Sequence, residues 1–219
     1  MNTLFAIDEF DTVDSPKWSD YAVTVSYSDD EIIKMIISLH NDGKSFDCDP
    51  TYSKGVFWQG LPQPRYKFDI APQTDGVQQA DARQLPLANG SISSLMFDPP
   101  FVAKNTQDRE PNGIIEMRFS GYKSVPDLWS FYQEALIEFY RVLSVDGVLA
   151  FKCQDMVSGG KQHWSHVEIY NMAKATGFYA KDLFILVRNN VLWSPNMENQ
   201  QHARKNHSFY WVFKKGKAK

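Results

Sequence analysis

The sequence lacks the features that mark secreted and membrane proteins. It has only two cysteines in 219 residues. Cys48 and Cys153 lie in or beside apolar segments, which favours buried thiols in a reducing compartment over a disulfide framework. No apolar run approaches the roughly 20 residues that span a bilayer. Residues 1–10 contain two acids and no basic residue, unlike a signal peptide. These absences predict a cytoplasmic protein with no membrane partner.

A strong net charge is also lacking, but the charge that is present is unevenly distributed. The net charge is −3, yet residues 1–50 hold 11 acidic and three basic side chains, and residues 202–219 hold six Lys or Arg and no acid. This basic tail is either a solvated end or a phosphate-facing patch. Arg204, Lys205 and His207 are therefore candidates for contacts with nucleic acid. His202 and His207 have no further His or Cys beside them, so we predict no metal site.

Short apolar runs alternate with amphipathic helices, and no repeat or low-complexity linker divides the chain. We expect one domain over residues 1–219, beginning with an irregular segment at 1–27. Capping boxes predict helix starts at Ser28, Ser124 and Ser165. Strands are predicted at 45–48, 66–70, 93–98, 148–151, 183–187 and 208–213. The alternation predicts an α/β fold whose mostly parallel sheet is covered on both faces, with the last strand inserted antiparallel.

The most informative tetrapeptide, Asp98-Pro99-Pro100-Phe101, directly follows an apolar strand. At the carboxyl edge of a parallel sheet, where α/β ligands bind, two prolines fix the direction of the nearby carbonyl groups. The Asp98 carboxylate and the Pro99 carbonyl are two acceptors for the two hydrogens of an NH₂ group, and Phe101 offers a stacking face. The competing interpretation is a Pro-Pro turn with a capping aspartate.

This tetrapeptide resembles the signature of the amino-methyltransferases that act on adenine N6 or cytosine N4. In that family an acidic or polar residue, two prolines and an aromatic follow the fourth strand; Asp in first place is usual for adenine N6, and Ser is commoner for cytosine N4. The resemblance implies S-adenosylmethionine (SAM) as the cofactor and a Rossmann-like domain with a mostly parallel seven-stranded sheet. It also implies nucleic acid as the partner, DNA more than RNA, as for a small phage-like orphan DNA methylase.

The resemblance further assigns a SAM site. The family has an Asp-Pro and a glycine-rich turn after the first strand, an acid that binds the ribose hydroxyls after the next, and then an acid that reads the adenine amino group. The corresponding residues here are Asp49, Pro50, Thr51, Tyr52, Gly55, Asp69, Ile70, Asp81 and Ala82. Ile70 is expected to pack on the SAM adenine. Ser53 and Lys54 stand where glycines are expected, which predicts a different backbone approach to SAM or weaker binding.

For the acceptor, the resemblance implies that an adenine is flipped out of the duplex beside Asp98, stacks on Phe101 and attacks the SAM methyl group. The residues after Phe101 are needed for the remaining strands and helices, so we expect no separate target-recognition domain. The target sequence is then expected to be recognised by the loops 102–123 and 188–207. The first loop closes over the base or is a flexible insertion. Trp193 in the second stacks on a base or anchors the loop.

Three other interpretations stay open. The same chemistry suits an RNA base methyltransferase. A catalytically silent subunit could keep the fold and bind SAM or nucleic acid for an active partner. A small-molecule amine methylase is the third, because the fold does not select the acceptor. No motif indicates the oligomeric state or the target sequence.

Overall fold

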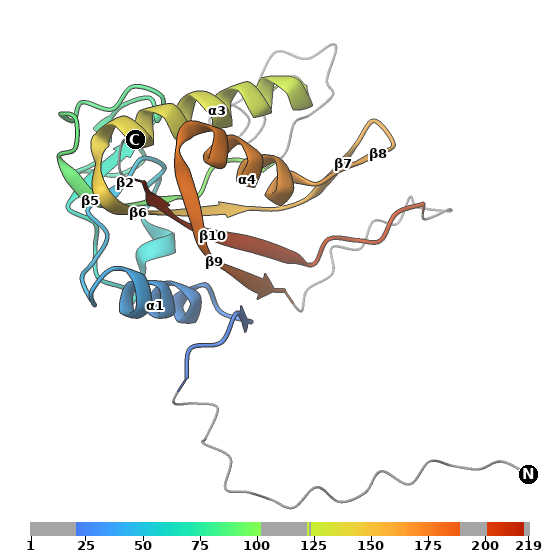
Figure 1. The fold of residues 1–219 in the computed structure, drawn as a ribbon, viewed down its shortest axis with the longest axis horizontal. Helices are drawn as coiled ribbons and strands as arrows, with labels where there is room; N and C mark the ends of the chain where they lie inside the picture. Colours follow the sequence, from blue (N-terminus) through green and yellow to red (C-terminus); the bar gives the residue numbers. More distant parts are fainter. Residues whose placement is uncertain (1–20, 102–121, 123, 189–200, 217–219) are drawn as a thin grey trace, which may run out of the picture.

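An eight-stranded sheet forms the centre of the computed structural model, which describes residues 21–101, 122, 124–188 and 201–216 (Figure 1). Across the sheet the strands are β1 (Val25–Ser26), β9 (Phe178–Val187), β10 (His207–Lys215), β6 (Leu143–Cys153), β5 (Ile92–Phe97), β2 (Cys48–Asp49), β3 (Tyr66–Asp69) and β4 (Gln78–Gln79). The helices are α1 (Asp29–His40), the 3₁₀ helix η2 (Val56–Trp58), α3 (Val125–Val142) and α4 (Ser165–Thr176).

The strand order reverses beside β2. From β2 the chain proceeds outward through β3 and β4 on one side, and it then returns to β5 and β6 on the other, all in parallel. β10 lies between β6 and β9 and is antiparallel to both. The α/β class, the mostly parallel sheet and the antiparallel last strand are therefore confirmed. This order is that of a doubly wound sheet, in which ligands bind outside the carboxyl ends of the strands at the point of reversal.

The sheet has eight strands rather than the expected seven, because two short strands, β1 and β4, join the six whose ranges were predicted. Val25 and Ser26 pair in parallel with Ile185 and Leu186 of β9, so the segment 1–27 is not irregular throughout. Two residues carry no periodic pattern, and only the neighbouring edge of β9 makes them a strand. β4, also of two residues, was not predicted for the same reason. Residues 1–20 lie outside the described part of the chain.

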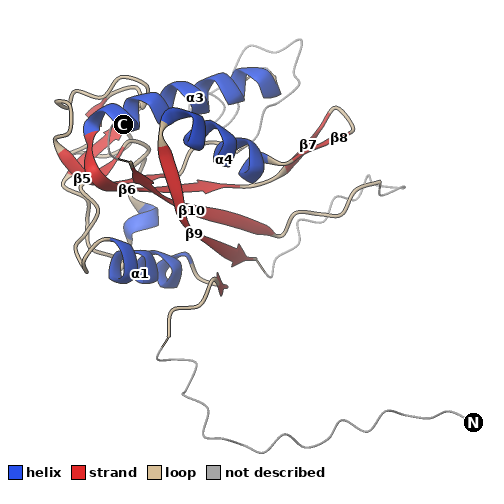
Figure 2. Cartoon of the chain, viewed as in Figure 1, coloured by secondary structure: helices blue, strands red, loops and turns tan. Residues whose placement is uncertain are grey.

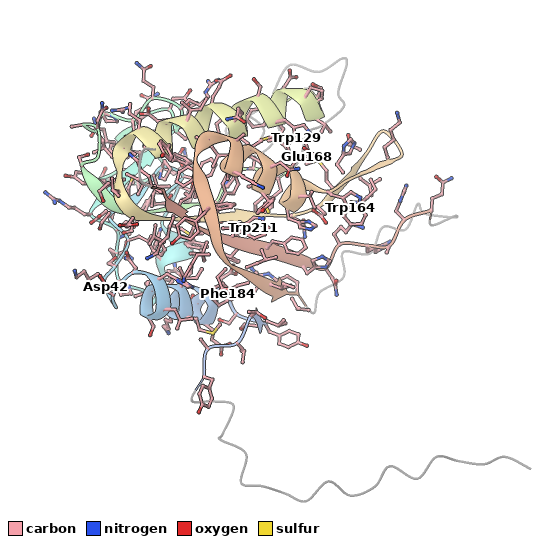
Figure 3. All side chains as sticks on the ribbon, in the orientation of Figure 1. Asp42, Trp129, Trp164, Glu168, Phe184 and Trp211 are labelled. Atoms are coloured by element: carbon pink, nitrogen blue, oxygen red, sulfur yellow. The ribbon has the colours of Figure 1, made fainter. Side chains whose placement is uncertain are left out.

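Helices cover both faces of the sheet, as predicted (Figure 2). α1 packs on one face over Met96, Ala150 and Phe184, within one buried apolar cluster. α3 and α4 pack on the other face over Phe97 and Phe151, within a second cluster. Alternate residues of β5 and β6 point to opposite faces, so each strand contributes to both clusters. Figure 3 shows the two sides, with Phe184 toward α1 and Trp211 toward α4.

Two of the three predicted helix caps are confirmed. The Ser28 hydroxyl accepts a hydrogen bond from the Glu31 N–H, and the Ser124 hydroxyl accepts one from the Asp127 N–H. The third is wrong, because the N-cap of α4 is Trp164 and Ser165 is its first, buried residue. The Asp155 carboxylate accepts the His166 N–H there, at 3.2 Å, and so replaces the expected serine.

Several strand bounds also differ from the prediction. β2 is Cys48–Asp49 rather than 45–48, while β6, β9 and β10 extend beyond their apolar cores. An unpredicted hairpin, β7 (Met156–Ser158) and β8 (Lys161–His163), projects from the sheet between β6 and α4 (Figure 1). Among the described residues, no helix is long and apolar enough to cross a membrane.

Candidate active site

A cavity of about 410 Å³ opens at the carboxyl ends of β2, β3 and β5, where the strand order reverses. Its volume lies within the roughly 300–1,000 Å³ of small-molecule sites. All four predicted acids line it, together with six other predicted residues: Asp49, Asp69, Asp81, Asp98, Pro50, Thr51, Tyr52, Ile70, Ala82 and Pro100. Ser53, Val56, Phe57, Arg83, Tyr122 and Phe131 complete the lining. The fold thus brings most of the predicted site residues together.

Asp49 is held rigidly at the base of this cavity. Its carboxylate accepts hydrogen bonds from the Thr51 N–H at 2.7 Å, the Thr51 hydroxyl at 3.0 Å and the Trp58 indole N–H at 2.7 Å. Its exposed fraction is 2%. Burial raises the pKa of Asp49 to about 7, even though the Trp58 and Thr51 bonds favour the anion. A cationic ligand in the cavity would therefore stabilise the ionised form of Asp49.

Asp69 joins the turn after β2 to the end of β3. Its two carboxylate oxygens accept the Ser53 N–H and the Ala71 N–H, both at 2.8 Å. Ser53 has a φ of 57°, the left-handed conformation that a glycine would adopt, and Gly55 follows with a φ of 70°. A Cβ on Gly55 would lie 2.5 Å from the Tyr52 hydroxyl oxygen. The turn therefore keeps a glycine-like path despite the missing glycines.

Asp81 and Ile70 present different surfaces to the same cavity. Both Asp81 oxygens accept bonds from the Arg83 guanidinium, the shortest at 2.7 Å, and Arg83 also contacts Glu134 at 3.1 Å. These hydrogen bonds lower the pKa of Asp81. Ile70 is 56% exposed, which leaves an apolar surface open to a flat ring. Any ligand amino group that Asp81 binds must share its carboxylate with Arg83.

Asp98 lies where β5 ends, between the cavity and a buried cation. Its N–H donates to the Thr51 hydroxyl at 3.1 Å, which joins it to Asp49 through a single side chain. Its carboxylate lies 3.3 Å from the Lys152 Nζ, which is also 3.1 Å from Asp29. Burial raises the pKa of Asp98, and the Lys152 ammonium opposes that rise. Asp98 therefore shares its counterion with a second acid.

The other residues of the tetrapeptide differ in their surroundings. Pro99 is buried, and the Pro100 carbonyl accepts the Tyr132 hydroxyl at 2.6 Å, which ties the motif to α3. Phe101 is half-buried and is not among the residues that line the cavity. Residues 102–121 and 123, predicted to close over the base, lie outside the described part of the chain. Tyr122 is described and lines the cavity.

Arg204, Lys205 and His207 lie at the same edge of the sheet but do not line the cavity. Their segment contacts the residues around the β7–β8 hairpin: Gln154, just before the hairpin, donates to the His207 carbonyl at 2.9 Å, and the His202 ring lies 3.1 Å from the Gly160 carbonyl in its turn. The Lys205 Nζ lies 5.8 Å from the ring centroid of Trp164, whose exposed fraction is 55%. Trp193 lies outside the described residues. In the described ranges, no group of three or more His, Cys, Asp or Glu side chains could hold a metal ion.

Sequence reasoning missed the residues that surround the four acids, above all Lys152, Asp29 and Arg83. Lys152 carried a signal that could have been read, because it interrupts the apolar run of β6, and a buried cation must find partners. Asp29 carried none, since a first-turn helix acid is ordinary. Its contact with Lys152 spans more than a hundred residues and depends on how α1 packs on the sheet.

No protein-family model and no curated protein sequence matches the chain, but solved structures do. TTHA0409 of Thermus thermophilus, provisionally named a DNA modification methylase and complexed with S-adenosyl-L-methionine, is 16% identical over 64% of this chain and 55% of its own, with a TM-score of 0.44. PvuII DNA methyltransferase, named as cytosine-N4-specific, is 17% identical over 62% of this chain and 47% of its own, with a TM-score of 0.45.

A third similar structure is a chain of the Haloferax volcanii complex between the Trm112 methyltransferase activator and a protein provisionally named a methyltransferase. It is 11% identical over 78% of this chain and 82% of its own, with a TM-score of 0.48. The chain spans about half the length of the TTHA0409 structures that it matches. These likenesses concern the fold; what the matched proteins bind or methylate is a property of those proteins.

Proposed function

We propose that the protein transfers the methyl group of SAM to an exocyclic amino group of a nucleic-acid base, with adenine N6 in DNA as the first candidate. The observation that carries the proposal is the position of Asp98 and the two prolines at the carboxyl end of β5, on the rim of an acid-lined cavity. A carboxylate held there can accept an N–H of an amino group while the nitrogen lone pair faces the cavity.

The cavity suits a cationic nucleoside such as SAM. Asp69 and, once ionised, Asp49 supply negative charge against a sulfonium and an ammonium group, whereas the Asp81 charge is already paired with Arg83. Ile70 supplies an exposed apolar surface for a purine ring. The left-handed turn at Ser53 and Gly55 lets the backbone pass close to a ligand. On this proposal Asp69 binds the ribose, Asp81 lies near the adenine, and the turn after β2 lies beside the methionine part.

The reaction needs positioning more than a strong base. When bound, SAM supplies an electrophilic methyl group: the amino nitrogen forms the new N–C bond as the S–C bond breaks, the electron pair stays on sulfur, and one proton leaves the nitrogen. Asp98 accepts an N–H bond throughout and, as the nitrogen becomes acidic, can take the proton or pass it to water. Tyr132 and Thr51 hold the motif through the Pro100 carbonyl and the Asp98 N–H.

A nucleic-acid acceptor is supported by the surface at the β10 end of the sheet edge at which the cavity opens. Lys161, Arg204 and Lys205 are basic, and Trp164 is an exposed ring between the β7–β8 hairpin and α4 (Figure 3). Basic groups interleaved with aromatic rings suit the phosphates and bases of a nucleic acid. DNA rather than RNA follows from the resemblance of the Asp98 motif to adenine-N6 enzymes, so RNA is the alternative that the test must exclude.

Incubation with methyl-labelled SAM and, separately, duplex DNA, single-stranded DNA and RNA tests the proposal. We expect label in DNA, and nucleoside mass spectrometry should identify N6-methyladenine. N4-methylcytosine would correct the base, and label only in RNA would correct the acceptor. SAM binding by calorimetry should accompany the assay. Binding without transfer to any acceptor would favour the silent subunit, and no binding at millimolar SAM would overturn the methyltransferase assignment.

A further inference from the structure

Lys152 is a buried cation in the middle of an apolar strand. Its side chain is 9% exposed, and its neighbours on β6, Phe151 and Cys153, are fully buried. The ammonium group lies 5.1 Å from the ring centroid of Phe57 and 5.4 Å from that of Tyr210. A charge removed from water to this extent is costly unless it is closely paired. Its position therefore demands partners, and the structure supplies two acids.

The two acids are Asp29 on α1 and Asp98 at the end of β5. The Nζ lies 3.1 Å from an Asp29 oxygen and 3.3 Å from an Asp98 oxygen, so the ammonium bridges two carboxylates. Asp29 has further partners, since it also accepts bonds from the Tyr210 hydroxyl and the Arg188 guanidinium. No other cation within ion-pair distance of Asp98 is found among the described residues.

We propose that Lys152 is a positioning residue for the acceptor site, which keeps Asp98 ionised and oriented, and that Asp29 competes with Asp98 for the same ammonium group. This inference rests on the function proposed above. An Asp98 carboxylate accepts an amino N–H with either oxygen, whereas a protonated Asp98 presents an O–H donor to a group that itself must donate. The ionised form is therefore the one that can hold the acceptor amino group.

The charged and titratable groups around Asp98 decide how far a substitution nearby should shift its pKa. Besides Lys152, the titratable groups that face it from the neighbouring elements are Asp29, Asp49, Tyr132, Arg188 and Tyr210. Burial raises the pKa of Asp98, and Lys152 lowers it. Although burial alone would raise the pKa of Asp29, Lys152, Tyr210 and Arg188 lower it below the usual value. Asp29 therefore stays ionised and attracts the Lys152 ammonium group, which it shares with Asp98.

Removal of Lys152 and removal of Asp29 should consequently shift the pKa of Asp98 in opposite directions. Removing the cation in Lys152→Met leaves Asp98 near Asp29 with no described cation within ion-pair distance of Asp98, and this raises the pKa of Asp98. Removing the competitor in Asp29→Asn frees Lys152 for Asp98 and lowers the pKa of Asp98. A charge at this distance shifts a carboxyl group by about one to three pH units. A purely structural role for Lys152 predicts no such pair of opposite shifts.

The test measures the pKa of the Asp98 carboxyl group and the effect of that pKa on the rate of methyl transfer. The carboxyl carbon of Asp98 is titrated by NMR in protein labelled with ¹³C-aspartate, assigned with Asp98→Asn, in the wild type, Lys152→Met, Asp29→Asn and Lys152→Arg. The acid limb of the methyl-transfer rate is then measured in the same proteins. Lys174→Met on α4, whose ammonium contacts only the Tyr170 ring among its described contacts, serves as the matched control. Thermal unfolding of each variant establishes that it is folded.

We expect Lys152→Met to raise the midpoint of the Asp98 NMR titration and the midpoint of the acid limb of the rate, each by about one pH unit or more. Activity at neutral pH should fall about tenfold or more and should recover at high pH. Asp29→Asn should shift both midpoints downward, Lys152→Arg should restore most of the wild-type behaviour, and Lys174→Met should change neither. An unchanged Asp98 titration in folded Lys152→Met overturns the inference. The expected NMR shifts without transfer by the wild type would support the electrostatic pairing but overturn the proposed function.

Discussion

The acids on the proposed cofactor side of the cavity, Asp49 and Asp69, and the acid on the proposed acceptor side, Asp98, find their hydrogen-bond partners in different ways. On the cofactor side, partners come from nearby in the chain: Asp49 binds Thr51 and Trp58, and Asp69 binds Ser53 and Ala71. On the acceptor side, Asp98 depends on Lys152, 54 residues away. The first arrangement needs only the turn after β2 and the adjoining end of β3, whereas the second exists only when β5, β6 and α1 have assembled. The two sides should therefore respond differently to mutation.

The largest effect should come from Asp98→Ala, which removes the proposed acceptor for the amino group. Methyl transfer should fall by about 10²- to 10³-fold, since loss of one positioned hydrogen-bonding group at a reacting centre costs about this much. The SAM dissociation constant, measured by calorimetry, should change less than about threefold, because the SAM-side contacts are local. Activity at the wild-type level would refute the assignment of Asp98.

A smaller and complementary effect is expected from Asp69→Ala. The substitution leaves the partly buried Ser53 N–H and Ala71 N–H without their acceptor, and a fully buried group would lose about 1–3 kcal/mol in this way, so each should lose less. SAM affinity should fall about tenfold or more as the turn loses its path. Asp75→Ala, at an exposed position soon after β3, is the control and should bind SAM normally. Equal binding by the two variants would show that the turn does not depend on Asp69.

Substitutions on the surface that carries Lys205 and Trp164 should weaken DNA binding moderately, and one of the two should also change its dependence on salt. Lys205→Ala and Trp164→Ala should each weaken DNA binding by up to about tenfold, through a lost phosphate contact and a lost stacking face respectively. Only Lys205→Ala should reduce the slope of log affinity against log salt, by about one. Fluorescence anisotropy at several salt concentrations measures both. A slope unchanged in Lys205→Ala would remove this lysine from the DNA contacts.

The smallest effect should be a pH dependence of SAM binding that originates at Asp49. Its pKa of about 7 lies above the usual 3.8, so protonation stabilises the unliganded fold at low pH, and this contribution is lost as the pH rises through about 7. A cationic ligand prefers the ionised form. SAM binding should therefore tighten several-fold between about pH 6 and pH 8 and release protons, as calorimetry in buffers of different ionisation enthalpy can detect. Asp49→Asn should flatten this dependence.

Much of the fold could be predicted wherever a local pattern decides it. The serine caps at Ser28 and Ser124 and the strand that precedes Asp98 depend on neighbours within a few residues. The cap predicted at Ser165 was wrong because Asp155, from the link between β6 and β7, accepts the hydrogen bond at the same helix terminus. The two-residue strands β1 and β4 could not be predicted, since their pairing depends only on the sheet edge beside them.

Local patterns in the chain were enough to predict an α/β fold with acids at successive strand ends, since periodicity and turn chemistry act over short distances. They also predicted the motif at Asp98, because two prolines and an aspartate stiffen a turn wherever it lies. The position of Lys152 between Asp98 and Asp29, in contrast, could be known only from the packed fold. A buried charge takes whichever partners the packed elements bring within a few ångströms, and those partners were brought by β5 and α1, which lie far from Lys152 in the chain.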